Sequence, residues 1–355
     1  MTSIGAHGSA PSTLLVTGGA GFIGSHTCVE LLGHGYELIV VDDFSNSTPR
    51  VFTRVERLTG RRIKAVHDVD VRDRRALSAV FDRHSVDAVV HFAARKAVGE
   101  STRLPVEYYD TNVGGTTNLL RAMQQHGVHR LVFSSSCSIY GDAGRVPLDE
   151  TAPARPANPY AASKWACEQI LADVCRRHPE FTVLSLRYFN PVGAHPSGLL
   201  GEDPRGTPDN LMPYVAQVAI GRRERLSVFG DDYDTPDGTA IRDYLHVMDT
   251  AEAHRVALEH LADAPGMQVF NLGVGAGRSV LDVIAAFGDA CGRPIPYKIV
   301  PRRPGDVTEL VADATAVERA WGWRATRDLA AMCRDAWRFQ QHNPHGYAAP
   351  AQQRA

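Results

Sequence analysis

The sequence has little of what marks several large classes of protein. Its six cysteines lie far apart and form neither a CxxC pair nor a grouping with histidine, so neither a disulfide-stapled small domain nor a structural metal site is predicted. No uninterrupted stretch approaches the roughly 20 apolar residues that a membrane-spanning helix needs. The formal net charge is only -2, so no broad basic surface for nucleic acid is implied. We therefore expect a cytoplasmic protein with reduced thiols, most of them buried, and with no metal, membrane or nucleic-acid partner.

The first half of the chain contains short apolar runs that alternate with helical segments, the first helix running from about Phe22 to His34. Near-continuous apolar strands separated by helices are typical of a parallel sheet that is covered on both faces. The sequence therefore predicts an α/β fold with a doubly wound parallel Rossmann sheet. The predicted strands are Thr13–Thr17, Glu37–Asp42, Asp87–Ala94, His129–Ser136 and Thr182–Asn190.

The composition changes after the last of these strands, and this change predicts the domain organisation. Residues 191–240 are rich in Gly, Pro and Asp, as expected for loops that grip a substrate above the carboxyl ends of a sheet. We predict a disordered leader at 1–12, a dinucleotide-binding Rossmann domain at 13–190 and a smaller α+β substrate domain at 191–355. The segment at about 240–262 is expected to pack back on the Rossmann domain.

Between the first strand and the first helix, the sequence TGGAGFIG places Gly18, Gly21 and Gly24 at a spacing that lets the backbone approach a pyrophosphate. By itself this pattern also fits a tight turn without a ligand. The next strand ends in Asp42, followed by Asp43, where a carboxylate accepts hydrogen bonds from ribose hydroxyls and repels a 2'-phosphate. We therefore expect NAD rather than NADP.

A second motif places Tyr160 and Lys164 four residues apart in a helix that begins near Pro159, so that both side chains share one face. An ammonium and a nicotinamide cation beside a phenol stabilise the phenolate, which would lower the tyrosine pKa towards the working range. Ser134–Ser136 end a predicted strand at the edge where ligands bind. One of these serines can hydrogen-bond a reacting oxygen, although such a run also fits the polar start of a loop.

Together these residues resemble the extended short-chain dehydrogenase/reductase family, and within it the UDP-glucose 4-epimerases. The resemblance covers nearly the whole chain. It rests on the segments TGGAGFIG, VVDDFSNS, HFAARKAVGES, FSSSCSIYGD, NPYAASK, LRYFNPVGAHPSG, NLMPYVAQVAIGRR, RDYLHVMD and RRPGD.

The resemblance implies that Ser136, Tyr160 and Lys164 are the catalytic residues. It also implies a set of residues around NAD, in which Thr111 and Asn112 support the nicotinamide side. Asp70 and Val71 would hold the adenine, although their position alone fits a plain turn equally well. The expected cofactor-binding residues are Gly18, Gly21, Phe22, Ile23, Gly24, Asp42, Asp43, Asn46, Ser47, Asp70, Val71, Phe92, Ala93, Ala94, Lys96, Thr111, Asn112, Ser134, Tyr160, Lys164 and Tyr188.

By the same resemblance the substrates are UDP-glucose and UDP-galactose, interconverted through a 4-keto sugar with no net redox change. Arg242 and Arg303 would clamp the diphosphate, and Phe229 would offer an apolar wall to uracil. The expected substrate-binding residues are Lys96, Ser136, Ser138, Tyr160, Phe189, Asn190, Asn210, Leu211, Ser227, Val228, Phe229, Arg242, Tyr244, Arg303, Asp306 and Leu310.

Several alternatives stay open. A sugar-nucleotide 4,6-dehydratase of the same family has an Asp-Glu pair where this chain has Cys137 and Ser138. Leu310, shorter than a tyrosine, leaves open a UDP-N-acetylglucosamine 4-epimerase; a uronate 4-epimerase and a non-catalytic NAD-binding sensor are further alternatives. The resemblance also implies a homodimer formed through helices near 102–126 and 158–178.

Overall fold

The computed structural model describes residues 12–144, 146–262, 264–303 and 305–347. The predicted leader at 1–12 lies outside these residues except for Ser12, whose main-chain N–H and hydroxyl both donate to Oδ2 of Asp87. Within the described ranges, no helix combines the length and the apolar character that crossing a membrane would require.

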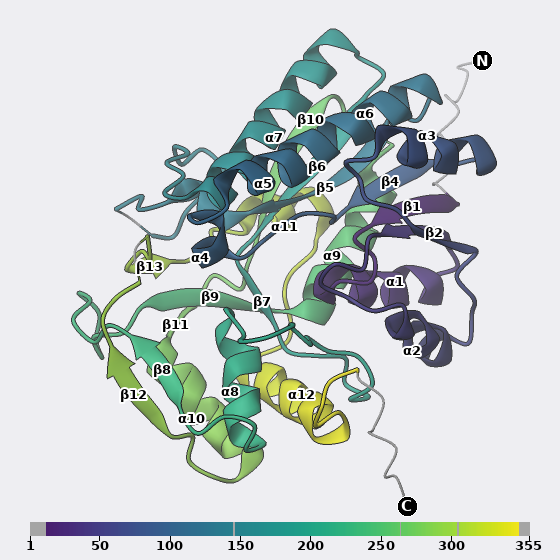
Figure 1. The fold of residues 1–355 in the computed structure, drawn as a ribbon. Helices are drawn as coiled ribbons and strands as arrows, with labels where there is room; N and C mark the ends of the chain where they lie inside the picture. The colour runs from purple at the N-terminus through teal and green to yellow at the C-terminus, as the bar shows by residue number, and fades with distance from the viewer. Residues whose placement is uncertain (1–11, 145, 263, 304, 348–355) are drawn as a thin grey trace, which may run out of the picture.

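The centre of the molecule is a seven-stranded sheet in the order β10-β6-β5-β4-β1-β2-β3, in which all neighbours are parallel. This order confirms the predicted doubly wound Rossmann sheet (Figure 1). The strands are β1 (Thr13–Thr17), β2 (Glu37–Asp42), β3 (Ala65–Asp68), β4 (Ala88–His91), β5 (Arg130–Ser136), β6 (Thr182–Tyr188) and β10 (Met267–Leu272).

Side chains on alternate strand positions enter two separate hydrophobic layers. Leu14 and Val16 of β1 pack towards one set of helices, whereas Leu15 between them packs towards the other. Because both faces are buried, the strands need no polar side, which explains their continuous apolar sequences. The first layer is covered by α1 (Phe22–Gly33), α2 (Arg50–Thr59), α9 (Val247–His260) and α11 (Thr315–Trp321), and the second by α3 (Arg74–Arg83), α6 (Gly115–Gln125) and α7 (Pro159–Arg177).

The remaining elements build a smaller α+β unit that lies beyond the carboxyl ends of the sheet strands (Figure 1). A small sheet has the order β11-β9-β13 with β7 beside β9, and β12 pairs with β8. The strands are β7 (Asn190–Val192), β8 (Leu226–Phe229), β9 (Ile241–His246), β11 (Gly277–Ser279), β12 (Tyr297–Val300) and β13 (Glu309–Leu310), and the helices are α8 (Leu211–Ala219), α10 (Val280–Cys291) and α12 (Leu329–His342).

The chain passes between the two units more than once. Helix α9 packs against α1, and β10 then joins the edge of the main sheet beside β6. The Rossmann sheet therefore extends beyond the predicted boundary at residue 190. Short helical elements follow two of the sheet strands. After β4 come α4 (Val98–Ser101), α5 (Pro105–Tyr109) and a π-helical turn η1 (Asp110–Gly114), and after β5 comes a 3-10 turn η2 (Cys137–Tyr140).

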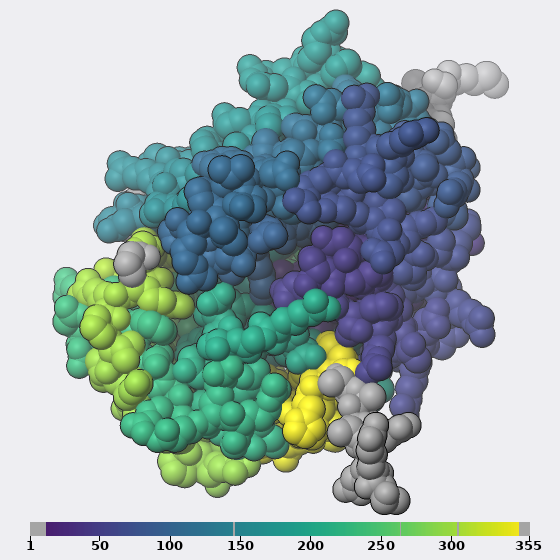
Figure 2. All heavy atoms as spheres, viewed as in Figure 1, coloured from purple at the N-terminus to yellow at the C-terminus, as the bar shows by residue number. Residues whose placement is uncertain are grey.

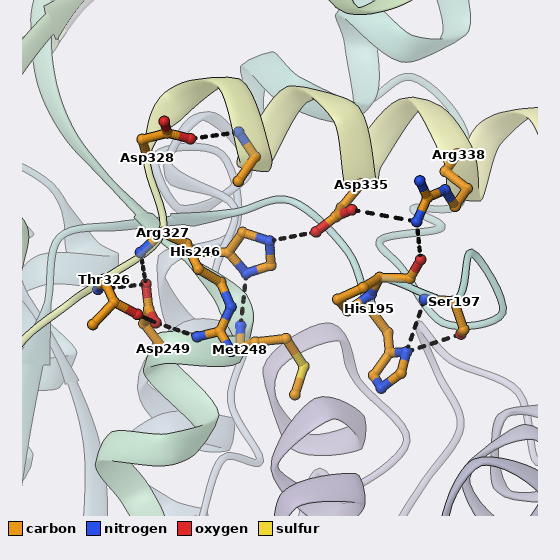
Figure 3. A network of polar contacts seen from close by, with 12 residues as sticks. His195, Ser197, His246, Met248, Asp249, Thr326, Arg327, Asp328, Asp335 and Arg338 are labelled. Carbon is orange, nitrogen blue, oxygen red and sulfur yellow. Dashed lines mark hydrogen bonds and ion pairs between the residues drawn. The ribbon is translucent and has the colours of Figure 1, made fainter.

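A buried polar network fastens β9 to the C-terminal helix α12 (Figure 3). His246, the last residue of β9, accepts at Nδ1 from the N–H of Met248 (3.0 Å) and donates from Nε2 to Asp335 of α12 (3.2 Å). Just before α12, the Arg327 guanidinium pairs with Asp249, which is almost fully buried at 1% side-chain exposure. These contacts hold the strand that carries Arg242 and Tyr244.

Candidate active site

The glycine turn after β1 forms a cradle that no larger residue could form. Gly18 has a φ of +68°, and a Cβ there would lie 2.6 Å from the N of Ala93 in the loop after β4. A Cβ on Gly24 would lie 2.3 Å from the carbonyl oxygen of Gly18. Gly21 is the N-cap residue of α1 and has no side chain to fill the space before that helix, which begins with Phe22. The cradle thus leaves main-chain groups at a helix N-terminus free to approach an anion.

Asp42 ends β2 beside this cradle and organises the loop that follows. Its Oδ2 accepts from the N–H of Ala20 (2.9 Å), and its Oδ1 accepts from the N–H of Phe44 (2.9 Å) and the hydroxyl of Ser47 (2.8 Å). Burial raises the pKa of this carboxyl, while those hydrogen bonds lower it. Asp43 instead accepts from Ser45, and the neighbouring Asn46 is exposed on the loop. Asp42 is therefore the carboxylate of this pair that points inwards.

Asp70, expected at the adenine, lies in the turn after β3. Its carboxylate is paired with Arg72 at 2.5 Å, and Arg72 also reaches Asp110 at 3.1 Å. Val71 is buried at 4% exposure, and a Cβ on Gly115 would lie 2.6 Å from its Cγ2. The carboxylate of Asp70 thus shapes the turn, and the side chain of Val71 packs into the layer beneath it.

The loop after β4 brings Phe92, Ala93 and Ala94 against the β1 turn. The N–H of Phe92 donates to the carbonyl of Thr17 (2.9 Å), and the N–H of Ala93 donates to the Thr17 hydroxyl (3.3 Å). Ile23, in the first turn of α1, packs against the hydrophobic layer on the same side as Phe92. These contacts bring the ends of β1 and β4 together on one side of the glycine cradle.

Ser136, Tyr160 and Lys164 meet at the carboxyl end of β5 and the first turns of α7. Asn158 caps α7 by accepting from the N–H of Ala161 (2.9 Å), so the helix begins at Pro159 as expected. The Tyr160 phenol is hydrogen-bonded to Ser136 and Ser138, whose hydroxyl oxygens lie 2.5 Å apart. The arrangement can pass a proton between the phenol and a serine hydroxyl.

Lys164 is 4% exposed and donates from Nζ to the carbonyl oxygen of Ser134 (2.7 Å). Burial lowers the pKa of its ammonium to about 8. Burial also raises the pKa of Tyr160 to about 12, although hydrogen bonds from Ser136 oppose the rise. Burial of the phenol acts against the lowering expected from the sequence. That expectation included a nicotinamide cation beside the phenol, and the Lys164 ammonium is directed at Ser134.

Tyr188, the last residue of β6, lies beside these residues. It is buried, and its hydroxyl donates to the hydroxyl of Ser134. Burial raises the pKa of this second phenol as well, and a charge on Tyr160 would raise it further. Tyr188 therefore stays protonated and holds the Ser134 side chain, while the Ser134 carbonyl holds Lys164.

A buried ion pair supports the catalytic corner and was missed from the sequence. Glu168 lies one helical turn after Lys164 and accepts from Ser135 (2.5 Å), Ser185 (3.1 Å) and the Nε of Arg187 (3.0 Å). The side chains of Arg187 and Glu168 are only 6% and 2% exposed. Arg187 extends the network to the Tyr140 hydroxyl at 3.0 Å. The network fixes the spacing between β5, β6 and α7.

Asn112 lies on the π-helical turn and ties the loop after β4 to α7. Its amide donates to Ser163 (2.8 Å) and to the carbonyl of Arg95 (3.0 Å), and its Oδ1 accepts from the Arg95 N–H (2.8 Å). Thr111 beside it is half-buried. Asn112 thus acts on the site through the loop that it holds.

In the smaller unit, β7 and β9 carry Asn190 and Tyr244 at paired positions. The Oδ1 of Asn190 is buried and has no hydrogen-bond partner among the described residues. A buried acceptor of this kind is expected to meet a donor from a ligand or a water. Two residues before Tyr244, Arg242 donates to the carbonyl oxygen of Ile241 (2.8 Å).

Arg303 and Phe229 also come together in this unit. The Arg303 guanidinium carbon lies 4.4 Å from the centre of the Phe229 ring, and Nε pairs with Asp306 at 3.1 Å. Ser227 on the same strand is half-buried, but Val228 is 1% exposed and packs into the hydrophobic core of the unit. Of the predicted set, Val228 can therefore offer a ligand only its main chain.

Leu310 packs in a small buried cluster with Phe189 and with Cys137, which follows Ser136 in the chain. Burial raises the pKa of the Cys137 thiol to about 12, so this position holds no acid or base near neutral pH. Leu211 lies at the start of α8 and packs against the core of the smaller unit. Phe189 and Leu310 thus belong to this cluster, whereas Leu211 belongs to the core of the smaller unit.

Comparison with known proteins agrees with this geometry. Residues 14–273 match the model of the NAD dependent epimerase/dehydratase family. The UDP-glucose 4-epimerase of Yersinia pestis is 51% identical over 335 residues, covering 94% of this chain and 99% of that protein. The mouse UDP-glucose 4-epimerase is 50% identical over 345 residues, covering 95% and 99%. The chain belongs to the UDP-glucose 4-epimerase family.

A solved member of this family has nearly the same fold. The structure of the Bifidobacterium longum UDP-glucose 4-epimerase in complex with NAD+ and UDP has a TM-score of 0.92, is 50% identical, and the match covers 94% of this chain and 99% of that one. The resemblance stated from the sequence motifs is thereby confirmed at the level of the family.

Glu202 is a carboxylate of this site that was not predicted from the sequence, and it contacts two residues that were predicted. Oε1 of Glu202 accepts from Nζ of Lys96 (2.9 Å) and from the side-chain amide of Asn210 (2.7 Å). The side chain of Glu202 is 9% exposed, whereas that of Lys96 is 50% exposed. No local pattern marks Glu202, because its partners lie 106 and 8 residues away in the chain.

Proposed function

We propose that this protein interconverts UDP-galactose and UDP-glucose by transient NAD-dependent oxidation at sugar C4, through a 4-keto intermediate. One observation carries the proposal: the Tyr160 phenol is hydrogen-bonded to Ser136, and Lys164, one helical turn further along α7, is buried against Ser134, at the same edge of the sheet as the glycine cradle. A phenol, a hydroxyl and an ammonium at the mouth of a dinucleotide-binding turn are suited to moving one proton during hydride transfer.

Tyr160 is the residue that accepts the proton of the C4 hydroxyl and later returns it. NAD, when bound, supplies the acceptor and donor of the C4 hydride and a positive charge near the phenol. That charge, together with the Lys164 ammonium, is what would bring the Tyr160 pKa down from about 12. Ser136 donates to the C4 oxygen as a carbonyl forms there.

The residues fit NAD rather than NADP. The main-chain groups between Gly18 and Phe22 would hold the pyrophosphate, because Gly18 and Gly24 leave no space for a Cβ and α1 begins there. Asp42 would hold the adenosine ribose, since it already faces inwards, and its negative charge disfavours a 2'-phosphate.

The UDP portion would be held on the other side of the cleft. Arg242 and Arg303 come from separate segments and can bind a diphosphate from two directions, and Phe229 presents its ring under Arg303. The unpartnered Oδ1 of Asn190 is a further acceptor for the ligand. If UDP is bound firmly and the sugar makes few polar contacts, the 4-keto sugar can rotate in the site before hydride returns to its other face.

Position 137 argues against a dehydratase. Elimination of water needs a general acid and a general base, and the two residues after Ser136 are the high-pKa thiol of Cys137 and the hydroxyl of Ser138. Because Leu310 is shorter than a tyrosine at this position, we propose that UDP-N-acetylglucosamine is accepted as a second substrate.

We further propose that the protein is a cytoplasmic homodimer. The dimer would use residues 102–126 and 158–178, where α5 carries the exposed apolar side chains Val106 (74%) and Tyr109 (42%). A second copy would bury this surface. The six cysteines are free thiols, which agrees with a reducing compartment.

The test is to incubate the purified protein with UDP-galactose and to separate the products by chromatography. UDP-glucose as the product supports the proposal. A 4-keto-6-deoxy product would identify a dehydratase, and the absence of any turnover would identify a non-catalytic NAD-binding protein; either result overturns the proposed reaction.

A further inference from the structure

One segment of the smaller unit touches the sheet edge on both sides of the glycine cradle. We call Glu202–Arg205 the strap. In the sheet, β1 lies between β4 and β2, so the turn that carries Gly18 lies between the loops that follow those two strands. The strap contacts the loop after β2 at one end and the loop after β4 at the other.

The first anchor is the guanidinium of Arg205. It donates to three main-chain carbonyls of the loop after β2: Ser45 (2.8 Å), Phe44 (3.1 Å) and Ser47 (2.8 Å). This loop is also held from the inside, because Phe44 and Ser47 donate to Asp42. Arg205 therefore closes the outside of the loop whose inner carboxylate is the expected partner of the adenosine ribose.

The second anchor is Glu202, which pairs with Lys96 in the loop after β4 at 2.9 Å. Neighbouring strands lie about 4.8 Å apart, so the ends of β2 and β4 are separated by about 10 Å. Three residue steps of extended chain reach about 10 Å. The strap thus has the length needed to span the ends of β4 and β2, between which β1 and its glycine turn lie.

The C-terminal segment also contacts the strap through Tyr347. Asp203 accepts from the N–H of Tyr347 (2.7 Å), and the Tyr347 hydroxyl donates to the carbonyl of Gly201 (2.8 Å). Arg54 of α2 donates to the carbonyl of Leu199 (2.8 Å). In Figure 2 a green part of the chain, coloured as residues near 200, reaches from the lower half of the molecule to the purple N-terminal part.

We propose that the strap retains the cofactor, with Arg205 and Glu202 as the positioning residues that keep it closed. This inference rests on the proposed NAD-dependent function. A dinucleotide bound along the cradle and Asp42 would lie under the strap and could leave only after the Arg205 contacts or the Lys96–Glu202 pair had broken. Retention serves the reaction, because the hydride taken from C4 must return from the same cofactor molecule.

The test is the rate of NAD release from the holoprotein of an Arg205→Gln variant. Arg319→Gln is the matched control, because Arg319 is an exposed arginine on α11 outside the strap. Holoprotein is freed of unbound NAD by gel filtration, and NAD in ultrafiltrates is measured over time by chromatography. We expect Arg205→Gln to release NAD about three- to tenfold faster than wild type, the loss expected for a few exposed charge-assisted hydrogen bonds, and Arg319→Gln to match wild type.

Two further readouts separate an opened strap from a generally destabilised protein. With saturating NAD, the initial rate and the melting temperature of Arg205→Gln should equal those of wild type; a loss in both that matches the faster release would indicate general destabilisation and overturn the proposal. Glu202→Gln should also speed release, because it removes the charge that holds Lys96. If Arg205→Gln releases NAD at the wild-type rate, the proposed role of the strap is wrong and the proposed function is unaffected. If the wild-type protein never binds NAD, both proposals are wrong.

Discussion

The Rossmann sheet and the smaller unit hold their charged groups in different ways. On the sheet side, Glu168 and Arg187 form an ion pair whose side chains are 2% and 6% exposed, enclosed by serine and tyrosine hydroxyls. On the nucleotide side, Arg303 pairs with Asp306 at 44% and 20% exposure, and Arg302 pairs with Asp232 at 43% and 70%. The difference indicates that the side proposed for the chemistry is preorganised, while the side proposed to bind the nucleotide can adjust.

The largest expected effect is on the catalytic phenol. Tyr160→Phe removes the group that carries the proton and should lower kcat by about 10³-fold or more, with NAD content unchanged. Tyr233→Phe on the nucleotide side removes a buried hydroxyl that has no hydrogen-bond partner within the described part of the chain, and should change kcat by less than about threefold. Steady-state rates with UDP-galactose measure both. Comparable losses in the two variants would contradict the assigned role of Tyr160.

The second prediction compares buried and exposed ion pairs. Arg187→Met leaves the Glu168 carboxylate buried without its partner and should lower the free energy of unfolding by about 3–5 kcal/mol. Arg302→Met should leave the unfolding curve indistinguishable from wild type, because its pair with Asp232 is exposed. Denaturant titrations followed by circular dichroism check both variants. A wild-type curve for Arg187→Met would show that the sheet side is not held as described.

The third prediction concerns the cost of burying an ammonium. The pKa of Lys164 falls from 10.5 to about 8 in the folded protein. Below pH 8 both folded and unfolded chains carry the charge, so the folded state bears the desolvation cost; between pH 8 and 10.5 only the unfolded chain binds the proton, so stability rises with pH.

Lys164→Met should therefore be more stable than wild type at pH 7, by up to about 3 kcal/mol, and should lack that rise. Its kcat should fall by about 10²-fold, because the phenolate loses its cation. Unfolding at pH 7 and pH 10 measures the first effect. A variant less stable than wild type at pH 7 would contradict the account.

The smallest expected effect is a change in substrate preference when Leu310 is replaced. Leu310→Tyr adds bulk beside Phe189 and should lower kcat/KM for UDP-N-acetylglucosamine about tenfold more than for UDP-glucose. Competition assays with both substrates measure the ratio. Absence of any UDP-N-acetylglucosamine turnover in the wild-type protein would refute the second-substrate proposal directly.

The contrast between buried and exposed regions also explains how much could be predicted from the sequence. All five predicted sheet strands are present, with ends within about three residues of the prediction, because their apolar runs report burial on both faces. The edge strand β10 was not foreseen. Met267–Leu272 gives no sign that it returns to the main sheet beside β6, since its pairing partners lie 84 positions earlier in the chain and leave no local pattern.

Which residues of the site could be predicted also depends on whether their spacing is local in the sequence. Tyr160 and Lys164 could be predicted because one helical turn sets their spacing. Glu202 and Arg205 could not, because their partners lie 106 and about 160 residues away in the sequence. The pKa of Tyr160 was predicted to fall with an ammonium and a nicotinamide cation nearby, whereas burial of the phenol acts in the opposite direction. Burial of this kind depends on the whole fold.

The central claim is that hydride leaves C4 and returns to C4 from one retained cofactor. The most direct measurement uses UDP-galactose that carries deuterium at C4, with mass spectrometry of the UDP-glucose formed. We expect the deuterium to stay on C4 of the product through inversion, without exchange into solvent and without added NAD. Loss of the deuterium to water, or inversion that continues undiminished in Tyr160→Phe, would contradict it.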